Sequence, residues 1–267
     1  MLSKGKTMNV IMYKAFSWLL WKDIRVLYQD LTNNILDAVM LPVGITFIHG
    51  YVLPHLGMPE NFGIFASIGT VIGMLMNSCS TFSNDLMMDL EGDKSIFYEI
   101  SLPLPYYLVY IKYALGYAIK AMLVNILILP ISILLMLGKV VFSEISLLKL
   151  FIAYISSCLF FGFFCLMVAI SIKNIVDLGR FWIRWGWQLY YVAGCLFSWM
   201  IMYKAVPLFA LINLLNPIVY PIEAMRGAFF GQAGYLPFWL CIAVIWLFTA
   251  LFMFYGLSKF KKRLDCI

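Results

Sequence analysis

Charged residues are scarce in this chain. Asp, Glu, Lys and Arg make up 12% of its 267 residues, whereas 64% of the residues are hydrophobic. A soluble domain has about 25% charged residues, so this scarcity excludes an ordinary soluble protein. The composition predicts an all-α integral membrane protein, with a single transmembrane domain over residues 1–267.

Residue types that support catalysis or metal binding are also sparse. The two histidines, His49 and His55, do not form an HExxH motif or another metal-ligand spacing. The six cysteines contain no CxxC pair, and five of them fall in apolar runs, where helix packing is the expected role. We therefore expect no enzyme active site, no metal site and no directly bound cofactor. No apolar leader with a cleavage site is visible, so we expect no signal peptide.

The net charge of +6 bears on topology, because cytoplasmic loops of membrane proteins collect Lys and Arg. This use of the excess charge is commoner than nucleic-acid binding, and we expect no nucleic-acid partner. Six apolar runs are long enough to cross a bilayer. They cover about 35–53, 62–82, 114–137, 150–172, 185–203 and 236–257.

Residues 205–235 contain a further apolar run that is interrupted by Asn213, Asn216, Pro217 and Pro221. If this run does not span, six crossings place 14 Lys and Arg on the side of both termini and four on the other side. A seventh crossing would move the basic C-terminal tail outside, against the positive-inside bias. We therefore predict a re-entrant helical hairpin over 205–235, with both termini in the cytoplasm.

Residues 8–31 have the pattern of an amphipathic helix that lies in the membrane interface. Its apolar residues recur every three or four positions, at Tyr13, Phe16, Leu20, Ile24, Leu27 and Leu31. The opposite, basic side includes Lys22 and Arg25, together with Trp18 and Trp21. The two tryptophans are expected to anchor in lipid headgroups or, alternatively, to contact a partner protein.

Residues 84–112, between the second and third predicted spans, are predicted to be cytoplasmic. Five of the 13 acidic residues of the chain lie here, next to Lys94; they are Asp85, Asp89, Glu91, Asp93 and Glu99. This concentration indicates a docking segment for another protein. The alternative is a solvated loop whose charge balances nearby basic residues.

A few polar and aromatic residues within the apolar runs are candidates for a transport pathway. Lys120 is expected to snorkel to the surface or to contact a substrate. Glu223 and Arg226, three positions apart, form either an intrahelical pair or part of a gate. Four aromatic residues either line a glycan path or face lipid; they are Trp187, Tyr190, Tyr191 and Trp199.

Two motifs give the chain a family resemblance. The first is DLEGDKSIFYEISLPLPY, at residues 89–106, and the second is NPIVYPIEAMRGAFF, at residues 216–230. With an interface helix, six spans and a broken hairpin before the last span, the chain resembles the ABC-2 type membrane subunits of ABC exporters. One departure is Gly92-Asp93-Lys94, where a typical member has an Arg-Glu pair.

The resemblance implies a permease in the bacterial inner membrane. Two copies would form the pathway in membrane lipid, and two copies of a separate ATPase would bind ATP and Mg. Residues of the 84–112 segment would contact the ATPase, and the hairpin residues Asn216, Pro217, Tyr220, Glu223 and Arg226 would shape a gate. The expected substrate is amphipathic or a lipid-linked glycan.

Two other functions stay open at this point. Within the same class, the protein could be a drug or lipid efflux permease. In a different class, it could be a self-contained channel or secondary carrier, because such proteins also use broken hairpins.

Overall fold

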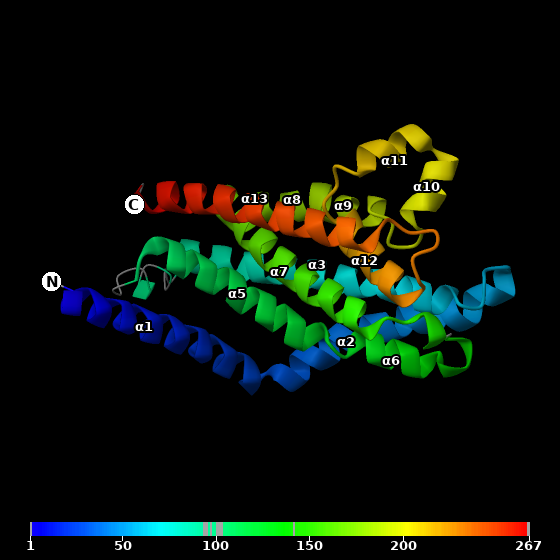
Figure 1. Ribbon diagram of the computed structural model, residues 1–267, viewed down its shortest axis with the longest axis horizontal. Coiled ribbons are helices and arrows are strands. Elements are labelled where there is room, and N and C mark those ends of the chain that lie inside the picture. Colours follow the sequence, from blue (N-terminus) through cyan, green and yellow to red (C-terminus); the bar gives the residue numbers. More distant parts are fainter. Residues whose placement is uncertain (1, 93–95, 97, 100–103, 141, 266–267) are drawn as a thin grey trace.

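The structure is a computed structural model that describes residues 2–92, 96, 98–99, 104–140 and 142–265. Within this part of the chain the secondary structure is helical and contains no strand, as the all-α prediction requires. The helices form an elongated bundle, and both termini lie at the same end of it (Figure 1). This end is called the termini end below, and the opposite end is called the far end.

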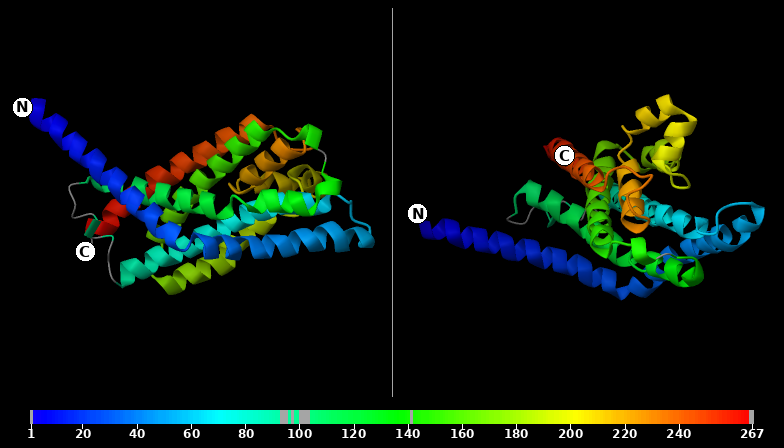
Figure 2. Two further views of the ribbon diagram at one scale, coloured as in Figure 1. Left: turned by 90° about the horizontal axis from the view of Figure 1, so that it is seen from below. Right: turned by 45° about the vertical axis from the view of Figure 1, so that its right-hand side comes forward.

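The first helix, α1 (Leu2–Gln29), confirms the helix predicted over 8–31. It lies along the outside of the bundle and bends at Asp30 into α2 (Leu31–Phe47) (Figure 2). Helical turns η1 (Ile48–Val52) and η2 (Leu53–Leu56) then extend α2 to the far end.

The centre of the bundle is α3 (Phe62–Glu91), most of whose residues are buried. It packs against α7 (Leu147–Ser171), which in turn packs against α13 (Phe238–Asp265) and α5 (Tyr106–Asn125). At the α5–α7 crossing, a side chain at Gly162 would collide with the carbonyl oxygen of Ala114. Glycine at this position therefore lets the two backbones approach closely.

The third predicted span is interrupted after α5. Residues 126–127 form a turn, and α6 (Ile128–Leu135) follows. Pro130 explains the break, because proline lacks the N–H that would bond to the carbonyl of Ile126 and its ring crowds that carbonyl. Short 3-10 turns η3 (Leu137–Lys139) and η4 (Phe142–Glu144) connect α6 to α7.

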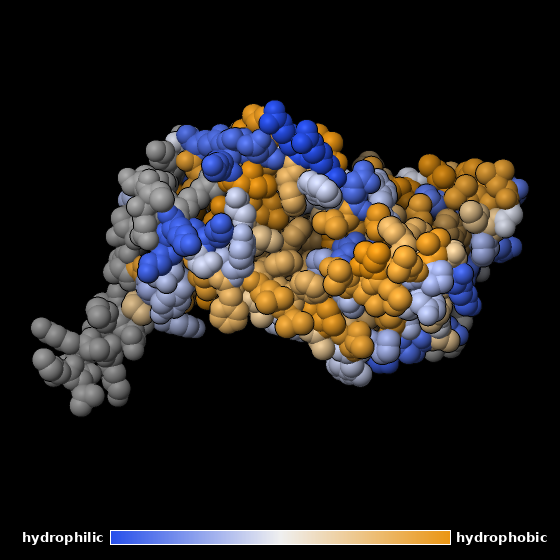
Figure 3. Space-filling view, turned by 90° about the horizontal axis from the view of Figure 1, so that it is seen from above, coloured by the Kyte–Doolittle hydropathy of each residue, from blue (hydrophilic) through white to orange (hydrophobic). Residues whose placement is uncertain are grey.

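In the described residues, five helical stretches are long and apolar enough to cross a membrane. They are Leu31–Leu56, Phe62–Glu91, Tyr106–Leu135, Leu147–Ser171 and Phe238–Lys262. Apolar residues form a broad area in the middle of the face seen in Figure 3, and hydrophilic residues lie along its upper edge and toward its two ends. The chain is therefore a multi-pass membrane protein.

The prediction of one continuous helix over 185–203 is wrong. A continuous helical rod begins earlier, and it consists of α8 (Ile175–Phe181), η5 (Trp182–Gly186) and α9 (Trp187–Val192). Residues 193–198 then form a turn in which Gly194 has a φ of 92°, a conformation that favours glycine. The rod was not recognised in the sequence because Asp177, Arg180 and Arg184 resemble a polar loop.

The broken run before the last helix forms three short helices. They are α10 (Trp199–Ala205), α11 (Pro207–Asn213) and α12 (Val219–Phe229). Helices α10 and α11 project from the bundle (Figure 1), whereas every residue of α12 is buried. Helix α12 packs between α7, α13 and α3, so the polar residues of this segment lie inside the protein.

Candidate functional site

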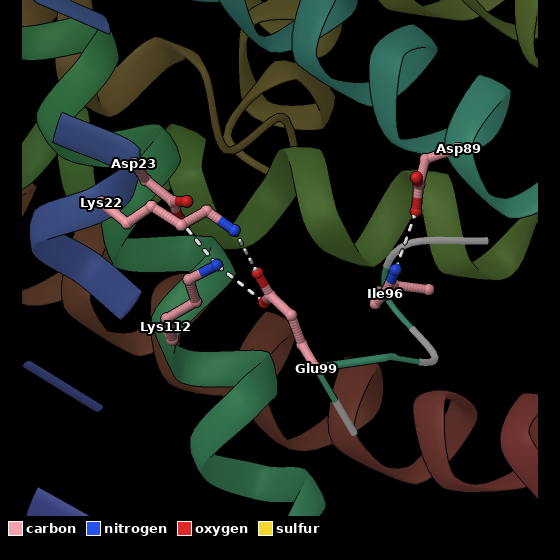
Figure 4. A network of polar contacts seen from close by, with 6 residues as sticks. All are labelled: Lys22, Asp23, Asp89, Ile96, Glu99 and Lys112. Atoms are coloured by element: carbon pink, nitrogen blue, oxygen red, sulfur yellow. Dashed lines mark hydrogen bonds and ion pairs between the residues drawn. The ribbon is translucent and has the colours of Figure 1, made fainter. Parts of the chain in front are cut away.

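A network of four charged residues joins three parts of the chain near the termini end (Figure 4). The Nζ atom of Lys112, on α5, lies 2.7 Å from Asp23 Oδ2 on α1 and 2.8 Å from Glu99 Oε2. The Nζ atom of Lys22, also on α1, lies 3.4 Å from Glu99 Oε1. This charged network ties α1 to the segment between α3 and α5.

Glu99 and Lys112 are buried and do not belong to a solvated loop. Glu99 is only 6% exposed and Lys112 only 1%. Burial of either charge alone would be costly, but each finds a partner of opposite sign within hydrogen-bonding distance. Two like charges, Lys22 and Lys112, thus share the same buried carboxylate.

The other acidic residues of this segment also make contacts within the chain or face the groove described below. Residues 84–91 continue α3 rather than forming a loop. Asp89 Oδ2 accepts a hydrogen bond from the Ile96 N–H at 3.0 Å, and Glu91 Oε1 accepts one from the Ile175 N–H at 2.9 Å. The second contact places a negative charge at the N-terminus of α8, where the helix dipole favours it. Asp85 is exposed on α3.

The predicted contacts Asp93 and Lys94 lie outside the described residues. On α1, the side chains of Trp18, Trp21 and Arg25 are exposed, so they are accessible to lipid headgroups or to a partner. Lys22, which was grouped with them, is instead a member of the charged network through its contact with Glu99. Contact of these residues with an ATPase stays a prediction.

A groove begins at the charged network. Its first cavity, of about 600 Å³, is lined by all four network residues. A second cavity of about 350 Å³ shares Asn34, Asp85 and Lys120 with the first. The groove therefore begins between α1 and α5, and the charged network forms part of its wall there.

Two more cavities extend the groove toward the far end. The third, of about 700 Å³, shares Asp37, Met74 and Asn77 with the second. The fourth, of about 490 Å³, shares Leu196 with the third and adjoins the loop after α2. These four adjoining cavities, here called the groove, follow the bundle from the charged network to the far end.

The predicted pathway aromatics divide into two groups. Trp187, Tyr190 and Tyr191 all line the third cavity. The Tyr190 hydroxyl also donates to the Gly69 carbonyl oxygen at 3.1 Å, which fixes α9 on α3. Trp199 is not at the groove; its indole N–H donates to the Ala210 carbonyl oxygen at 2.9 Å and joins α10 to α11.

Arg226, on α12, binds the backbone of the turn over residues 193–198. Its guanidinium donates to the carbonyl oxygens of Gly194 at 2.6 Å, Cys195 at 2.6 Å and Phe197 at 2.7 Å. The ring of Phe65 lies 3.8 Å from the guanidinium carbon. Because Leu196 belongs to this turn, Arg226 fixes the wall between the third and fourth cavities.

Glu223, one turn earlier on α12, holds two other backbone groups. Its carboxylate accepts hydrogen bonds from the N–H groups of Trp199, at 2.9 Å, and Leu236, at 3.1 Å. In the part of the chain that the structure describes, Glu223 and Arg226 form no ion pair, so the intrahelical pair is a wrong interpretation. Together these two buried residues form what is called the backbone clamp below.

The remaining hairpin residues organise the turn before α12. Asn216 donates to the Leu189 carbonyl oxygen at 2.7 Å and accepts from the Ile218 N–H at 3.1 Å. The Tyr220 hydroxyl donates to the Leu214 carbonyl oxygen at 2.7 Å. Pro217 lies in the same turn. These contacts shape the hairpin, and a gating role for it stays a prediction.

Some residues of the site were not recognised in the sequence. Asp23 completes the charged network, and Asn34 and Asn77 line the groove. The four-residue spacing of Asn77, Thr81 and Asp85 was the signal for the groove, because it places three polar side chains on one face of a helix. In the described residues, no group of His, Cys, Asp or Glu is arranged to hold a metal ion.

Comparison with known proteins identifies the family. No curated protein matches the chain. The family model described as ABC-2 type transporter matches residues 14–230, which include the charged network, most of the groove and the backbone clamp. Because this match covers well over half of the sequence, the chain belongs to the ABC-2 type transporters.

Proposed function

We propose that this protein is the permease subunit of an ATP-driven exporter. Two copies form the transport pathway, and two copies of a separate ATPase subunit bind ATP and Mg and supply the work. The family match supports a permease that works with an ABC ATPase. The bacterial inner membrane is the proposed location, and a lipid-linked glycan or another amphipathic molecule is the proposed substrate.

The observation that carries this proposal is the double role of the charged network. Its four residues join α1, the segment around Glu99 and α5, and the same residues line the first cavity of the groove. Movement of the Glu99 segment relative to α1 must therefore change the shape of this end of the groove. An ATPase dimer that closes on ATP beneath this segment would drive that movement.

The proposed topology follows from the direction of the helices. The helical rod over residues 175–192 begins near Glu91, at the termini end, and runs along α3 to the turn at 193–198. With the five apolar stretches, the rod makes six crossings, which is consistent with termini on one side. The excess of basic residues on that side supports a cytoplasmic location for it. Helix α1 then lies in the cytoplasmic interface, and residues 205–235 re-enter the membrane.

Transport proceeds in three steps in this scheme. The substrate enters the groove next to the charged network, from the cytoplasmic leaflet. ATPase closure shifts α1 against α5, narrows this end and moves the substrate past the third cavity. The turn held by the backbone clamp then yields, and the substrate leaves at the far end.

Isolation of the native complex tests the proposal. The protein is purified from its own membranes in a mild detergent, and the co-purifying proteins are identified by mass spectrometry. We expect an ATPase subunit with a phosphate-binding loop, and ATP-dependent export when the complex is placed in liposomes. A protein that purifies alone and moves ions without ATP would instead be a channel or secondary carrier.

A matched pair of variants tests the role of the charged network in the same liposomes. Glu99→Gln removes the carboxylate that Lys22 and Lys112 share, and we expect ATP hydrolysis to continue while export falls. Asp177→Asn changes an exposed acid on α8 whose carboxylate contacts its near neighbours Asn174 and Arg180, so export should be retained. Equal export by both variants would contradict the coupling role of Glu99.

A further inference from the structure

The third cavity of the groove is mostly apolar and carries a single charged residue. Its volume of about 700 Å³ lies within the range of about 300–1,000 Å³ that is usual for small-molecule sites. Of the described residues that line it, Asp37 is the only Asp, Glu, Lys or Arg. His49 also borders this cavity, and its Nδ1 atom lies 2.8 Å from the Ile45 carbonyl oxygen, so one of its two ring nitrogens is already used.

Asp37 places a carboxylate where charges are costly. It belongs to the first half of α2, in a stretch that is apolar enough to cross a membrane. A carboxylate in such a stretch usually has a partner or a function. The side chain is exposed, and within the described part of the chain it forms no ion pair. Its charge is therefore available to a ligand in the groove.

The neighbouring cavities do not supply a surplus of positive charge. The second cavity, which Asp37 also lines, adds Asp85 and Lys120, whose formal charges cancel. The Lys120 Nζ atom lies 4.6 Å from the centre of the Phe82 ring. The fourth cavity adds Glu144 and, among the described residues that line it, no Lys or Arg. Beyond the first cavity the groove therefore has a net negative charge, although the chain as a whole has a net charge of +6.

Aromatic side chains surround the same part of the groove. The third cavity is lined by three that contact one another, with ring centroids 5.3 to 6.2 Å apart: Trp187, Tyr190 and Tyr191. The fourth cavity is lined by four more: Phe62, Phe65, Phe230 and Tyr235. The face of an aromatic ring attracts cations, and Trp attracts them most strongly. Phe65 already holds the buried Arg226 guanidinium in this way, at 3.8 Å.

This combination of side chains distinguishes between ligands by their charge. A cation would gain an ion pair with Asp37 and contacts with aromatic rings. An anion would meet Asp37 and then Glu144, in two cavities that no described Lys or Arg lines. A neutral molecule would leave the Asp37 carboxylate without a partner.

We propose that the third cavity binds an amphipathic organic cation, a quaternary or protonated amine with an apolar body. Asp37 pairs with the cationic centre, and Trp187 and Tyr191 contact the alkyl groups around it. The apolar body lies against Leu41 and Met74, which line the same cavity. This inference rests on the proposed permease function. Of the substrates named there, it selects an amphipathic molecule and assigns a positive charge to it.

Binding to the wild-type protein in phosphatidylcholine nanodiscs tests the site, with equilibrium dialysis as the measurement and protein-free nanodiscs as the background. The probes are tetraphenylphosphonium and tetraphenylborate, two ions of similar shape and opposite charge. We expect saturable binding of tetraphenylphosphonium to the protein, and binding of tetraphenylborate at the background level. If tetraphenylphosphonium does not bind saturably, or if the two ions bind equally, the proposal is overturned.

Replacement of Asp37 tests the ion pair. Asp37→Asn should weaken tetraphenylphosphonium binding by about tenfold or more, since contacts between charged groups are the stronger ones. Asp177→Asn is the matched control, because it removes the same charge from an exposed residue that lines none of the four cavities. Equal affinities of these two variants would overturn the role of Asp37.

Replacement of Trp187 tests the aromatic contact. Trp187→Leu should weaken tetraphenylphosphonium binding by about fivefold. Trp185→Leu is its control, because Trp185 lies two positions earlier on the same rod, is exposed and lines none of the four cavities. Equal affinities of this second pair would overturn the contact with Trp187. Circular dichroism shows whether each variant has folded, and Trp187→Leu tests the site independently if Asp37→Asn does not fold.

Failure of this site and failure of the permease function are distinguishable, because binding in nanodiscs needs no ATPase. A complex that exports with ATP while the protein does not bind tetraphenylphosphonium would remove the cation site and leave the permease function intact. Binding that depends on Asp37, in a protein that purifies without an ATPase, would retain the cation site and contradict the permease function.

Discussion

Replacement of Lys112 by methionine removes the central cation of the charged network. Its ammonium lies within 2.8 Å of both Asp23 and Glu99, and its side chain is almost fully buried. Lys112→Met leaves Glu99 with Lys22 alone, at 3.4 Å, and the Lys22 side chain is 48% exposed. Two carboxylates that shared a cation would then repel each other.

The expected cost follows from the burial of each partner. Removing one member of a buried ion pair costs about 3–5 kcal/mol. The side chain of Asp23 is 33% exposed, so water can solvate it after the change, and the cost lies near the lower limit. We therefore expect Lys112→Met to lower the free energy of unfolding by about 3 kcal/mol.

A second substitution separates the ion pair from simple packing. In a Glu99→Gln background an uncharged amide replaces the carboxylate that pairs with Lys112. Lys112→Met should therefore lower the free energy of unfolding by less than it does in the wild type. The double variant should therefore be more stable than the sum of the single changes predicts, by about 1–3 kcal/mol. Strict additivity would show that Lys112 and Glu99 do not interact energetically.

Equilibrium unfolding by SDS in mixed micelles, followed by circular dichroism, measures these differences. Lys149→Met is the control, because Lys149 is only partly buried and forms no ion pair among the described residues. We expect it to lie within about 0.5 kcal/mol of the wild type. If Lys112→Met is as stable as this control, the charged network does not stabilise the folded protein.

The backbone clamp and the helix contacts give further predictions. Arg226→Lys should raise the rate of proteolysis in the turn over residues 193–198. An ammonium on a flexible stem cannot reproduce the planar guanidinium that contacts three carbonyl oxygens. Proteolysis at the wild-type rate would contradict this role of Arg226. Gly69→Ala should lower thermal stability in detergent, because a Cβ at this position collides with the Cys195 carbonyl oxygen. Gly44→Ala should leave it unchanged, because no neighbouring atom lies within 4 Å of a Cβ at position 44. Equal melting temperatures of these two variants would show that α3 and the turn do not approach as closely as described.

The sequence predicted the membrane class and the positions of most spans because apolar runs of about 20 residues have few alternatives to a helix in lipid. It failed at the rod over residues 175–192, since three charged residues in its first part resemble a loop. Two of these charges, Asp177 and Arg180, are tolerated because they pair on the exposed surface of the rod. Hydropathy alone cannot distinguish such a helix from a connection.

Some residues of the candidate site were predicted from the sequence, but their partners were not. Glu99, Glu223 and Arg226 were recognised as unusual residues because charges are rare in this chain. Their partners could not be predicted, because Glu99 pairs with residues 77 and 13 positions away and Arg226 bonds to carbonyls about 30 positions earlier. Composition shows that a charge needs a partner, but only the packing of the helices determines which partner it finds.

The charged network borders one end of the groove, and the backbone clamp fixes the wall between its third and fourth cavities. The two places are held by bonds of different kinds, and this difference predicts which of them opens more readily. The charged network consists of pairs between side chains, and Lys22 is half exposed, so water can replace part of its interaction with Glu99 at a cost of about 1 kcal/mol or less. The backbone clamp is fully buried, and release of Arg226 would leave three carbonyl oxygens and a guanidinium without partners at once. Each unsatisfied buried group costs about 1–3 kcal/mol, so the clamp is the harder one to open. In the proposed export cycle, opening at the clamp would therefore require more work than movement beside the charged network.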